Sequence, residues 1–363
     1  MKYRMDEITE SCLGKMLDSK KNKGEYQPYL ANINVRWGSF DLNNLSLMRF
    51  EQNENDRYGI KYGDLIMCEG GEPGRCAIWR DELPNMKIQK ALHRIRPNTN
   101  LVDVEYLYYW FLLSGKNDLL RRHFTETTIK HLPGETLKQL VIDLPDMKIQ
   151  KNISTVLRSI DKKITVNEKI NDNLEQQMHL IFENMMAKAA THKLSGEYTI
   201  AQNLATVVTG KEDANFSVPN GKYKFFTCSN TPLSCDEYVF DSSSILIAGN
   251  GDFNVKHYSG KFNAYQRTYV LTPDKKYFGL LYLASLYRIN SFKSRSSGSI
   301  VKFITKSDVE NIPVFIPNDR FYLQELNKLI YLQEQNKLEN ELLVNLRDWL
   351  LPMLMNGQAT ISD

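Results

Sequence analysis

The chain lacks any long hydrophobic run. None of its apolar stretches approaches the roughly 18 residues that a membrane-spanning helix needs, and residues 1–7 show no apolar core of a signal peptide. The five cysteines form no CxxC pair, and Cys68 and Cys76 are too widely spaced for a zinc knuckle. These absences argue against a membrane span and a disulfide framework, and they favour free thiols in a reducing cytoplasm.

Motifs of common catalytic sites are also missing. There is no GxxxxGK[ST] phosphate loop, no HExxH, no GxSxG and no Asn-Pro-Pro-aromatic tetrapeptide typical of amino-methyltransferases. The glycine-rich stretch 69–74 carries Glu69 and Glu72, which would repel phosphate. The six histidines form no ligand-spaced cluster. The sequence therefore predicts a binding protein that is not an enzyme and that holds no metal or cofactor of its own.

What the chain does contain is an internal repeat. Apolar residues at sevenfold spacing in 146–188 recur as apolar residues 172 positions later. The strand-like sequence 140–145 recurs at 312–317, and 65–71 resembles 245–251. The period is far too long for a solenoid unit. Several matches in the same order indicate duplication of a whole module, each copy followed by a helical arm.

The repeat predicts an α+β fold with two globular α/β modules, two long antiparallel helices and a pseudo-twofold relation between the halves. The expected boundaries are 1–145 for the first module, 146–190 for the first helix, 191–317 for the second module, and 318–363 for the second helix and tail. Turn residues and apolar runs further predict strands at 65–68, 75–79, 244–248 and 264–267, and buried helices at 104–113 and 280–287.

Both arms carry an apolar seam of the coiled-coil type. A helix of about 35–40 residues would be roughly 50–60 Å long, more than a small module needs for its own core. Asn167 and Asn171 interrupt the first seam, which costs stability but fixes register. We expect the arms to pair antiparallel; the alternative is that each folds back on its own module. The predicted seam consists of Leu157, Ile160, Ile164, Leu174, Met178, Leu329, Leu332, Leu343, Leu346 and Leu350.

Basic and polar clusters occupy matching places in both modules, between the buried helix and the last strands. Arg, Lys, Ser and Thr on such loops suit contacts to phosphates and base edges. A solvated charged loop explains any single one of them equally well, and Arg267 could instead belong to a structural pair at a strand edge. The candidate DNA-binding residues are Arg36, Trp37, Arg75, Lys90, Arg94, Arg121, Arg122, Thr127, Lys130, Arg267, Lys293, Arg295, Ser297 and Lys302.

Three stretches, 63–79, 263–267 and the tail 350–358, give the chain a likeness to a known family. Together with the alternation of modules and helices, they resemble the specificity (S) subunit of type I restriction-modification enzymes. The usual turn ending in Glu-Gln before each arm is replaced here by 145–150 and 317–320, which leaves the start of the second arm less defined.

The resemblance implies that each module is a target recognition domain that reads one half of a bipartite double-stranded DNA sequence. It also implies that the helices set the spacer and dock two methyltransferase (M) subunits, with restriction (R) subunits in the full complex. S-adenosylmethionine, ATP and Mg are then expected on those partners and not on this chain. Two other hypotheses compete: a coiled-coil scaffold that binds protein partners, and a nuclease with an unrecognised carboxylate site.

Overall fold

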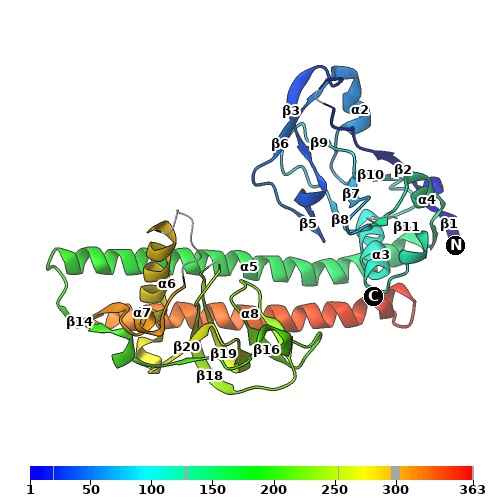
Figure 1. The fold of residues 1–363 in the computed structure, drawn as a ribbon. Helices are drawn as coiled ribbons and strands as arrows, with labels where there is room; N and C mark the ends of the chain where they lie inside the picture. The colour runs from blue at the N-terminus through cyan, green and yellow to red at the C-terminus, as the bar shows by residue number, and fades with distance from the viewer. Residues whose placement is uncertain (19, 127–129, 252, 296–302, 362–363) are drawn as a thin grey trace. The chain divides into compact units, whose positions relative to one another are not determined.

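The computed structural model describes residues 1–18, 20–126, 130–251, 253–295 and 303–361. The chain divides into two compact units (Figure 1). Unit 1 comprises Met1–Lys163 and Leu343–Asp363, and unit 2 comprises Ile164–Leu342. No helix among the described residues is long and apolar enough to cross a membrane.

Unit 1 is built on a four-stranded antiparallel sheet with the order β2-β10-β7-β8. Helix α3 packs its aromatic and aliphatic side chains into the core beside this sheet. A second sheet, β6-β3-β9, has a separate small core. The bounds are β2 Thr9–Leu13, β3 Glu25–Leu30, β6 Ser46–Phe50, β7 Leu65–Cys68, β8 Cys76–Ile78, β9 Lys87–Ile88, β10 Leu92–Pro97 and α3 Val104–Lys116.

Unit 2 is built on a six-stranded sheet with the order β15-β20-β18-β19-β16-β17. Among its described strand pairs, β16–β19 is parallel and the others are antiparallel. Helix α6 takes the place that α3 has in unit 1 and supplies much of the core. The bounds are β15 Ala205–Thr209, β16 Tyr223–Phe226, β17 Leu233–Cys235, β18 Phe240–Ala248, β19 Val255–Ala264, β20 Thr268–Pro273 and α6 Phe278–Arg295.

The same supersecondary arrangement precedes each long helix. In unit 1, β1 (Lys2–Arg4) pairs antiparallel with β13 (Val141–Asp143), which leads into α5. In unit 2, β14 (Gly196–Ile200) pairs antiparallel with β21 (Pro313–Pro317), which leads into α8. The repeat seen in the sequence is thus a repeat of structure. Helix α5 spans Met147–Ala190 and α8 spans Arg320–Met355.

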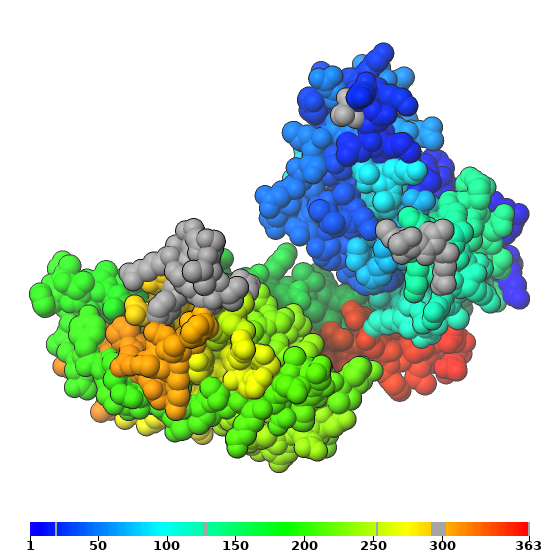
Figure 2. Space-filling model, viewed as in Figure 1, coloured from blue at the N-terminus to red at the C-terminus, as the bar shows by residue number. Residues whose placement is uncertain are grey.

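The two long helices contact each other within each unit. In unit 2, Lys188 Nζ lies 3.2 Å from Tyr322 Oη, and Asn171 Oδ1 lies 2.9 Å from Asn336 Nδ2. The residue numbers rise along α5 while they fall along α8, so the helices run antiparallel there (Figure 1). In unit 1, Arg347 of α8 pairs with Asp161 of α5 at 2.8 Å. The C-terminal residues, red in the space-filling view, also pack against the segment that contains α3 (Figure 2).

The predicted seam is uneven. Leu157, Ile160, Leu174, Met178 and Leu329 are buried. The other five predicted seam positions divide into two groups. Ile164, Leu343 and Leu350 are partly buried, whereas Leu332 and Leu346 are exposed by 40% and 44%. The regular seam expected for the second helix is therefore wrong at Leu332 and Leu346, because these side chains are turned toward solvent.

Polar side chains replace apolar ones at the middle of this helix pair, in unit 2. Asn167 is fully buried, and its Nδ2 donates to Glu339 Oε2 at 2.7 Å and to Asn340 Oδ1 at 2.8 Å. Asn171 accepts from Asn336 at 2.9 Å. Each contact joins α5 to α8, so this layer fixes which residues of the two helices face each other.

The strand predicted at 264–267 is wrong. Strand β19 ends at Ala264, and β20 begins at Thr268. Between them lies a tight turn, which Thr268 N closes by donating to Tyr265 O at 2.8 Å. Arg267 is therefore exposed in this turn and is not part of a strand-edge pair.

Candidate nucleic-acid interface

The glycine-rich stretch 69–74 of unit 1 forms a loop that neighbouring side chains hold in place. Trp37 Nε1 donates to Glu72 Oε1 at 2.9 Å. Arg75 pairs with Glu72 at 2.8 Å and donates to Asn32 O at 3.2 Å. The Glu72 carboxylate therefore organises the loop, and these contacts leave Arg75 only partly exposed.

A pocket of about 480 Å³ opens beside this loop, within unit 1. Three of the sequence candidates line it: Trp37, Arg121 and Lys130. Sequence reasoning missed Lys116 at the end of α3 and Arg347 of α8, which bring further positive charge to its wall. We call this cavity the Trp37 pocket. Its aromatic and charged lining consists of Trp37, Glu72, Tyr108, Lys116, Asp118, Arg121, Phe124, Lys130 and Arg347.

The remaining DNA-binding candidates of unit 1 differ in the contacts that their side chains make within the protein. Arg36, Lys90 and Arg122 are exposed. Arg36 donates to the Ile33 carbonyl at 2.5 Å, and Arg122 Nε lies 3.1 Å from the neighbouring His123 ring. Thr127 lies outside the described residues.

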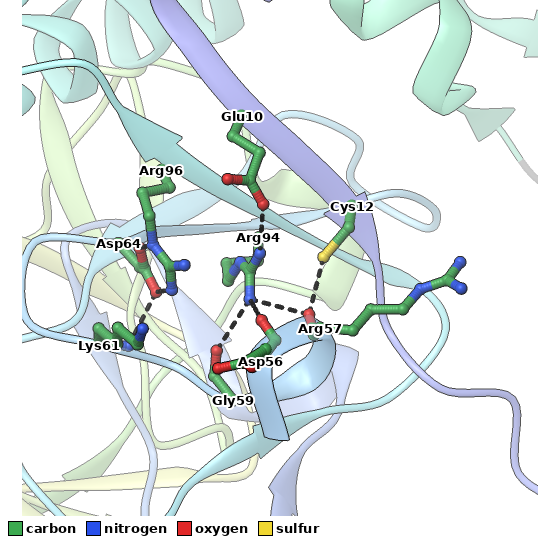
Figure 3. A network of polar contacts seen from close by, with 9 residues as sticks. All are labelled: Glu10, Cys12, Asp56, Arg57, Gly59, Lys61, Asp64, Arg94 and Arg96. Atoms are coloured by element: carbon green, nitrogen blue, oxygen red, sulfur yellow. Dashed lines mark hydrogen bonds and ion pairs between the residues drawn. The ribbon is translucent and has the colours of Figure 1, made fainter. Parts of the chain in front are cut away.

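Arg94 is a structural residue, which corrects its prediction as a DNA contact. Only 1% of it is exposed. Its Nη1 donates to the carbonyls of Asp56, Arg57 and Gly59 at 2.8, 2.8 and 3.1 Å, and its Nη2 pairs with Glu10 at 3.0 Å (Figure 3). The guanidinium thus binds the carbonyls at the end of a short helix, and it could reach DNA only if the unit unfolded.

Other titratable side chains of unit 1 are also buried in the interior. His93 is buried, its Nε2 lies 2.9 Å from Leu132 O, and burial lowers the pKa of its imidazole. Burial also raises the pKa of the Cys68 and Cys76 thiols, which disfavours the reactive thiolates. Among the described residues, no three His, Cys, Asp or Glu side chains are grouped so that they could hold a metal ion.

In unit 2 the loop at Gly249–Gly251 occupies the place of the glycine-rich loop of unit 1. Gly249 N donates to Arg267 O at 2.8 Å, so the loop and the exposed Arg267 are neighbours. Ser297 and Lys302 lie outside the described residues. Lys293 and Arg295 belong to the last turns of α6, and their side chains lie outside the described part. The structure therefore places one candidate of unit 2 at a loop like that of unit 1.

Comparison with known proteins identifies the family. A family model described as "Type I restriction modification DNA specificity domain" matches residues 1–176 and 204–345. The type I restriction enzyme EcoDI specificity subunit of Escherichia coli is 36% identical over 164 residues, which are 43% of this chain and 37% of that subunit. The chain thus matches well under half of the length of that relative.

More distant relatives match over a greater length. The putative type I restriction enzyme MjaX specificity subunit of Methanocaldococcus jannaschii is 23% identical over 400 aligned positions, covering 95% of this chain and 90% of that subunit. The crystal structure of a type I restriction-modification S subunit from M. genitalium has a TM-score of 0.59 and 19% identity, and the match covers 98% and 95% of the two chains. That likeness concerns the fold alone. Because the family model matches most of the sequence in two separate segments, the chain belongs to the family of type I restriction-modification DNA specificity domains.

Proposed function

We propose that this chain is the DNA-recognition subunit of a type I restriction-modification complex, and that each of its two globular modules is a target recognition domain reading one half of a bipartite sequence. The observation that carries the proposal is the double match of the family model, one match for each copy of the repeat. Two similar modules in one chain can contact DNA as the two subunits of a dimer do.

The reading surface we propose follows the loops that border the glycine-rich stretch in each unit. In unit 1, Arg36, Trp37, Arg121, Arg122 and Lys130 are exposed or line the Trp37 pocket. Arginine and lysine on loops neutralise phosphates, and arginine can also read guanine in the major groove. Arg75 and Lys90 are secondary candidates. Thr127, Arg267, Lys293, Arg295, Ser297 and Lys302 complete the proposed set.

We propose that α5 and α8 act as an antiparallel coiled-coil spacer and as the docking site for two methyltransferase subunits. Tyr331, Leu338 and Leu342 of α8 are exposed by 59%, 52% and 62%. Their spacing of seven and four residues puts them on one side of the helix. An exposed apolar stripe of this kind suits a partner helix, and Leu332 adds to it.

In this proposal the chain itself is not catalytic. The chain lacks the motifs of common catalytic sites, and its described side chains hold no metal-binding cluster. The methyltransferase subunits would bind S-adenosylmethionine, and restriction subunits would bind ATP and Mg.

Methylome sequencing of a host that carries the chain with its partner subunits tests the proposal. We expect one methylated bipartite sequence. Exchange of residues 194–317 for the corresponding module of another family member should change one half of that sequence and leave the other unchanged. A change in both halves, or in neither, would contradict the assignment of one module to one half.

A test on the purified complex separates DNA reading from a protein-binding scaffold. Because phosphate contacts release counterions, affinity for target duplex should fall steeply as salt rises. The double variant Arg121→Ala/Arg122→Ala should weaken binding and reduce the salt slope. Lys20→Ala, which removes an exposed charge elsewhere in unit 1, serves as the matched control.

A further inference from the structure

The Trp37 pocket has a volume and an aromatic lining that contacts to the surface of duplex DNA do not require. Its volume of about 480 Å³ lies in the range of roughly 300–1,000 Å³ that small-ligand sites occupy. Trp37, Tyr108 and Phe124 bring three aromatic rings to its lining, and Leu112 and Leu120 add an apolar surface. Such a lining suits a flat, aromatic ligand.

The indole of Trp37 is held in place before any ligand arrives. Its Nε1 donates to Glu72 Oε1 at 2.9 Å. Its ring edge packs against Gly115 of α3, where an added Cβ would lie 2.9 Å from indole carbons Cζ2 and Cη2. Only a glycine at position 115 allows this approach, so the indole forms a preformed wall of the pocket.

The charges around the pocket divide into paired and free groups. Lys116 pairs with Asp348 at 2.5 Å, and Arg347 pairs with Asp161 at 2.8 Å. The side chains of Arg121 and Lys130 make no ion pair with any side chain that the structure describes, and both are exposed. Two free cations at the edge of an aromatic pocket favour a ligand that carries an anion beside its ring.

We propose that the Trp37 pocket binds a single nucleotide, with its base against Trp37 and its phosphate near Arg121 and Lys130. Bases stack on aromatic side chains whatever their identity. Asp118, which also lines the pocket, would accept hydrogen bonds from a base amino group or a ribose hydroxyl. The nucleotide has two sources: one extruded from bound DNA, or a free nucleotide in solution. The first deepens the proposed DNA-reading function, and the second is independent of it.

The first experiment measures binding of free 2-aminopurine riboside 5′-monophosphate to the full chain by fluorescence. We expect saturable quenching, which Trp37→Ala weakens about tenfold through loss of stacking. Arg121→Ala and Lys130→Ala should each weaken it several-fold, and Lys20→Ala should leave it unchanged. The same base without its phosphate should bind more weakly and should not respond to Lys130→Ala.

The second experiment places 2-aminopurine, one position at a time, in a duplex that contains the methylated target. Extrusion unstacks the base and changes its fluorescence at one position only. Gly115→Ala should abolish that change while exposed phosphate contacts still hold the duplex. This variant also replaces Trp37→Ala should the latter fail to fold, since it alters the pocket without removing the indole.

The outcomes separate the two sources. Binding of the free nucleotide without a signal in DNA assigns the pocket to a nucleotide in solution, and a signal in DNA assigns it to extrusion. If neither probe responds while the chain still binds its target duplex, the pocket proposal is overturned and the proposed function stands. If free nucleotide binds but Trp37→Ala and Gly115→Ala do not weaken it, the ligand lies elsewhere and the proposal is also overturned.

Discussion

The two units use different chemistry at equivalent positions of the repeat. Tyr109 of α3 and Tyr282 of α6 are 173 positions apart, and Asp161 and Gln333 are 172 apart. In unit 1, Tyr109 Oη donates to Asp161 Oδ2 at 2.7 Å, and Arg347 pairs with the other oxygen of the same carboxylate at 2.8 Å. A negative charge on α5 therefore connects the globular part to both long helices.

In unit 2 an imidazole takes over this role. The ring of His257, from β19, meets that of Tyr282 edge-on at a centroid distance of 4.9 Å. His257 Nε2 lies 2.9 Å from Gln333 Oε1, and Nδ1 lies 3.0 Å from Glu334 Oε1. Ser259 Oγ also donates to Glu334, at 2.9 Å. At this position the polar contacts to α8 come from strand β19.

The difference shows what duplication preserved. The positions of the core helix and of the long helix that faces it have stayed in register, because apolar packing fixes them. The polar contacts were replaced as a set, because a buried polar group is costly unless all of its partners change with it. The two units should therefore respond differently to the same kind of substitution.

The largest effect should come from giving unit 1 the residue of unit 2. Asp161→Gln removes the carboxylate that Arg347 and Tyr109 share. The side chains of the ion pair are 18% and 27% exposed, so the loss should be about 2 kcal/mol rather than the larger cost of a fully buried pair. Chemical denaturation of the full chain, with hydrogen exchange followed separately in each unit, measures it.

Asp172→Gln is the matched control for that substitution. Asp172 lies on α5 and is exposed, so its change should alter stability by less than about 0.5 kcal/mol. If Asp161→Gln costs no more than this control, the Asp161 carboxylate does not stabilise unit 1, and the contrast between the two units is wrong.

A smaller loss is expected for His257→Phe in unit 2. Phenylalanine keeps the edge-on contact with Tyr282 but removes both hydrogen bonds of the imidazole, which should cost about 1–2 kcal/mol. A double-mutant cycle with Glu334→Gln separates the Glu334 contribution. A coupling energy near zero would mean that the imidazole and the carboxylate do not stabilise one another.

The smallest effect concerns pH. Burial alone would raise the pKa of Glu334, but hydrogen bonds from His257 and Ser259 outweigh it and lower that pKa below its ordinary value of 4.5. The ionised carboxylate therefore contributes stability above about pH 4.5, and this contribution is lost as the pH falls through the lowered pKa. Glu334→Gln should reduce the acid sensitivity of unit 2, as followed by hydrogen exchange between pH 3 and 7. An unchanged profile would contradict this origin.

Much of the fold could be predicted from the sequence, because it rests on periodicity. The strands at 65–68 and 244–248 and both long helices are confirmed, with helix bounds within a few residues. The strand predicted at 264–267 is wrong because the sequence pattern does not reveal the hydrogen-bonded turn between Tyr265 and Thr268, which follows the end of β19 at Ala264. Leu332 and Leu346 were wrongly assigned to the seam because heptad spacing alone does not distinguish a buried seam from an exposed apolar stripe.

The candidate site was less predictable. Trp37, Arg121 and Lys130 were found as separate residues, but only the folded chain brings them together in one pocket. Arg347 was missed because it lies far from them in the sequence. Arg94 was misjudged because arginines usually lie at the surface, whereas this buried arginine binds three carbonyls and the carboxylate of Glu10.

The polar layer between α5 and α8 has a consequence for the origin of the chain. Asn167 and Glu339, which touch at 2.7 Å, occupy the same position in the two copies of the repeat. In a symmetric dimer of a single copy, that position would face itself, as Asn against Asn or Glu against Glu. Two facing glutamates would repel one another. The present Asn–Glu pair needs two different copies. Fusion of the two copies into one chain therefore allows a contact at the middle of the helix pair that a symmetric dimer of either copy could not form.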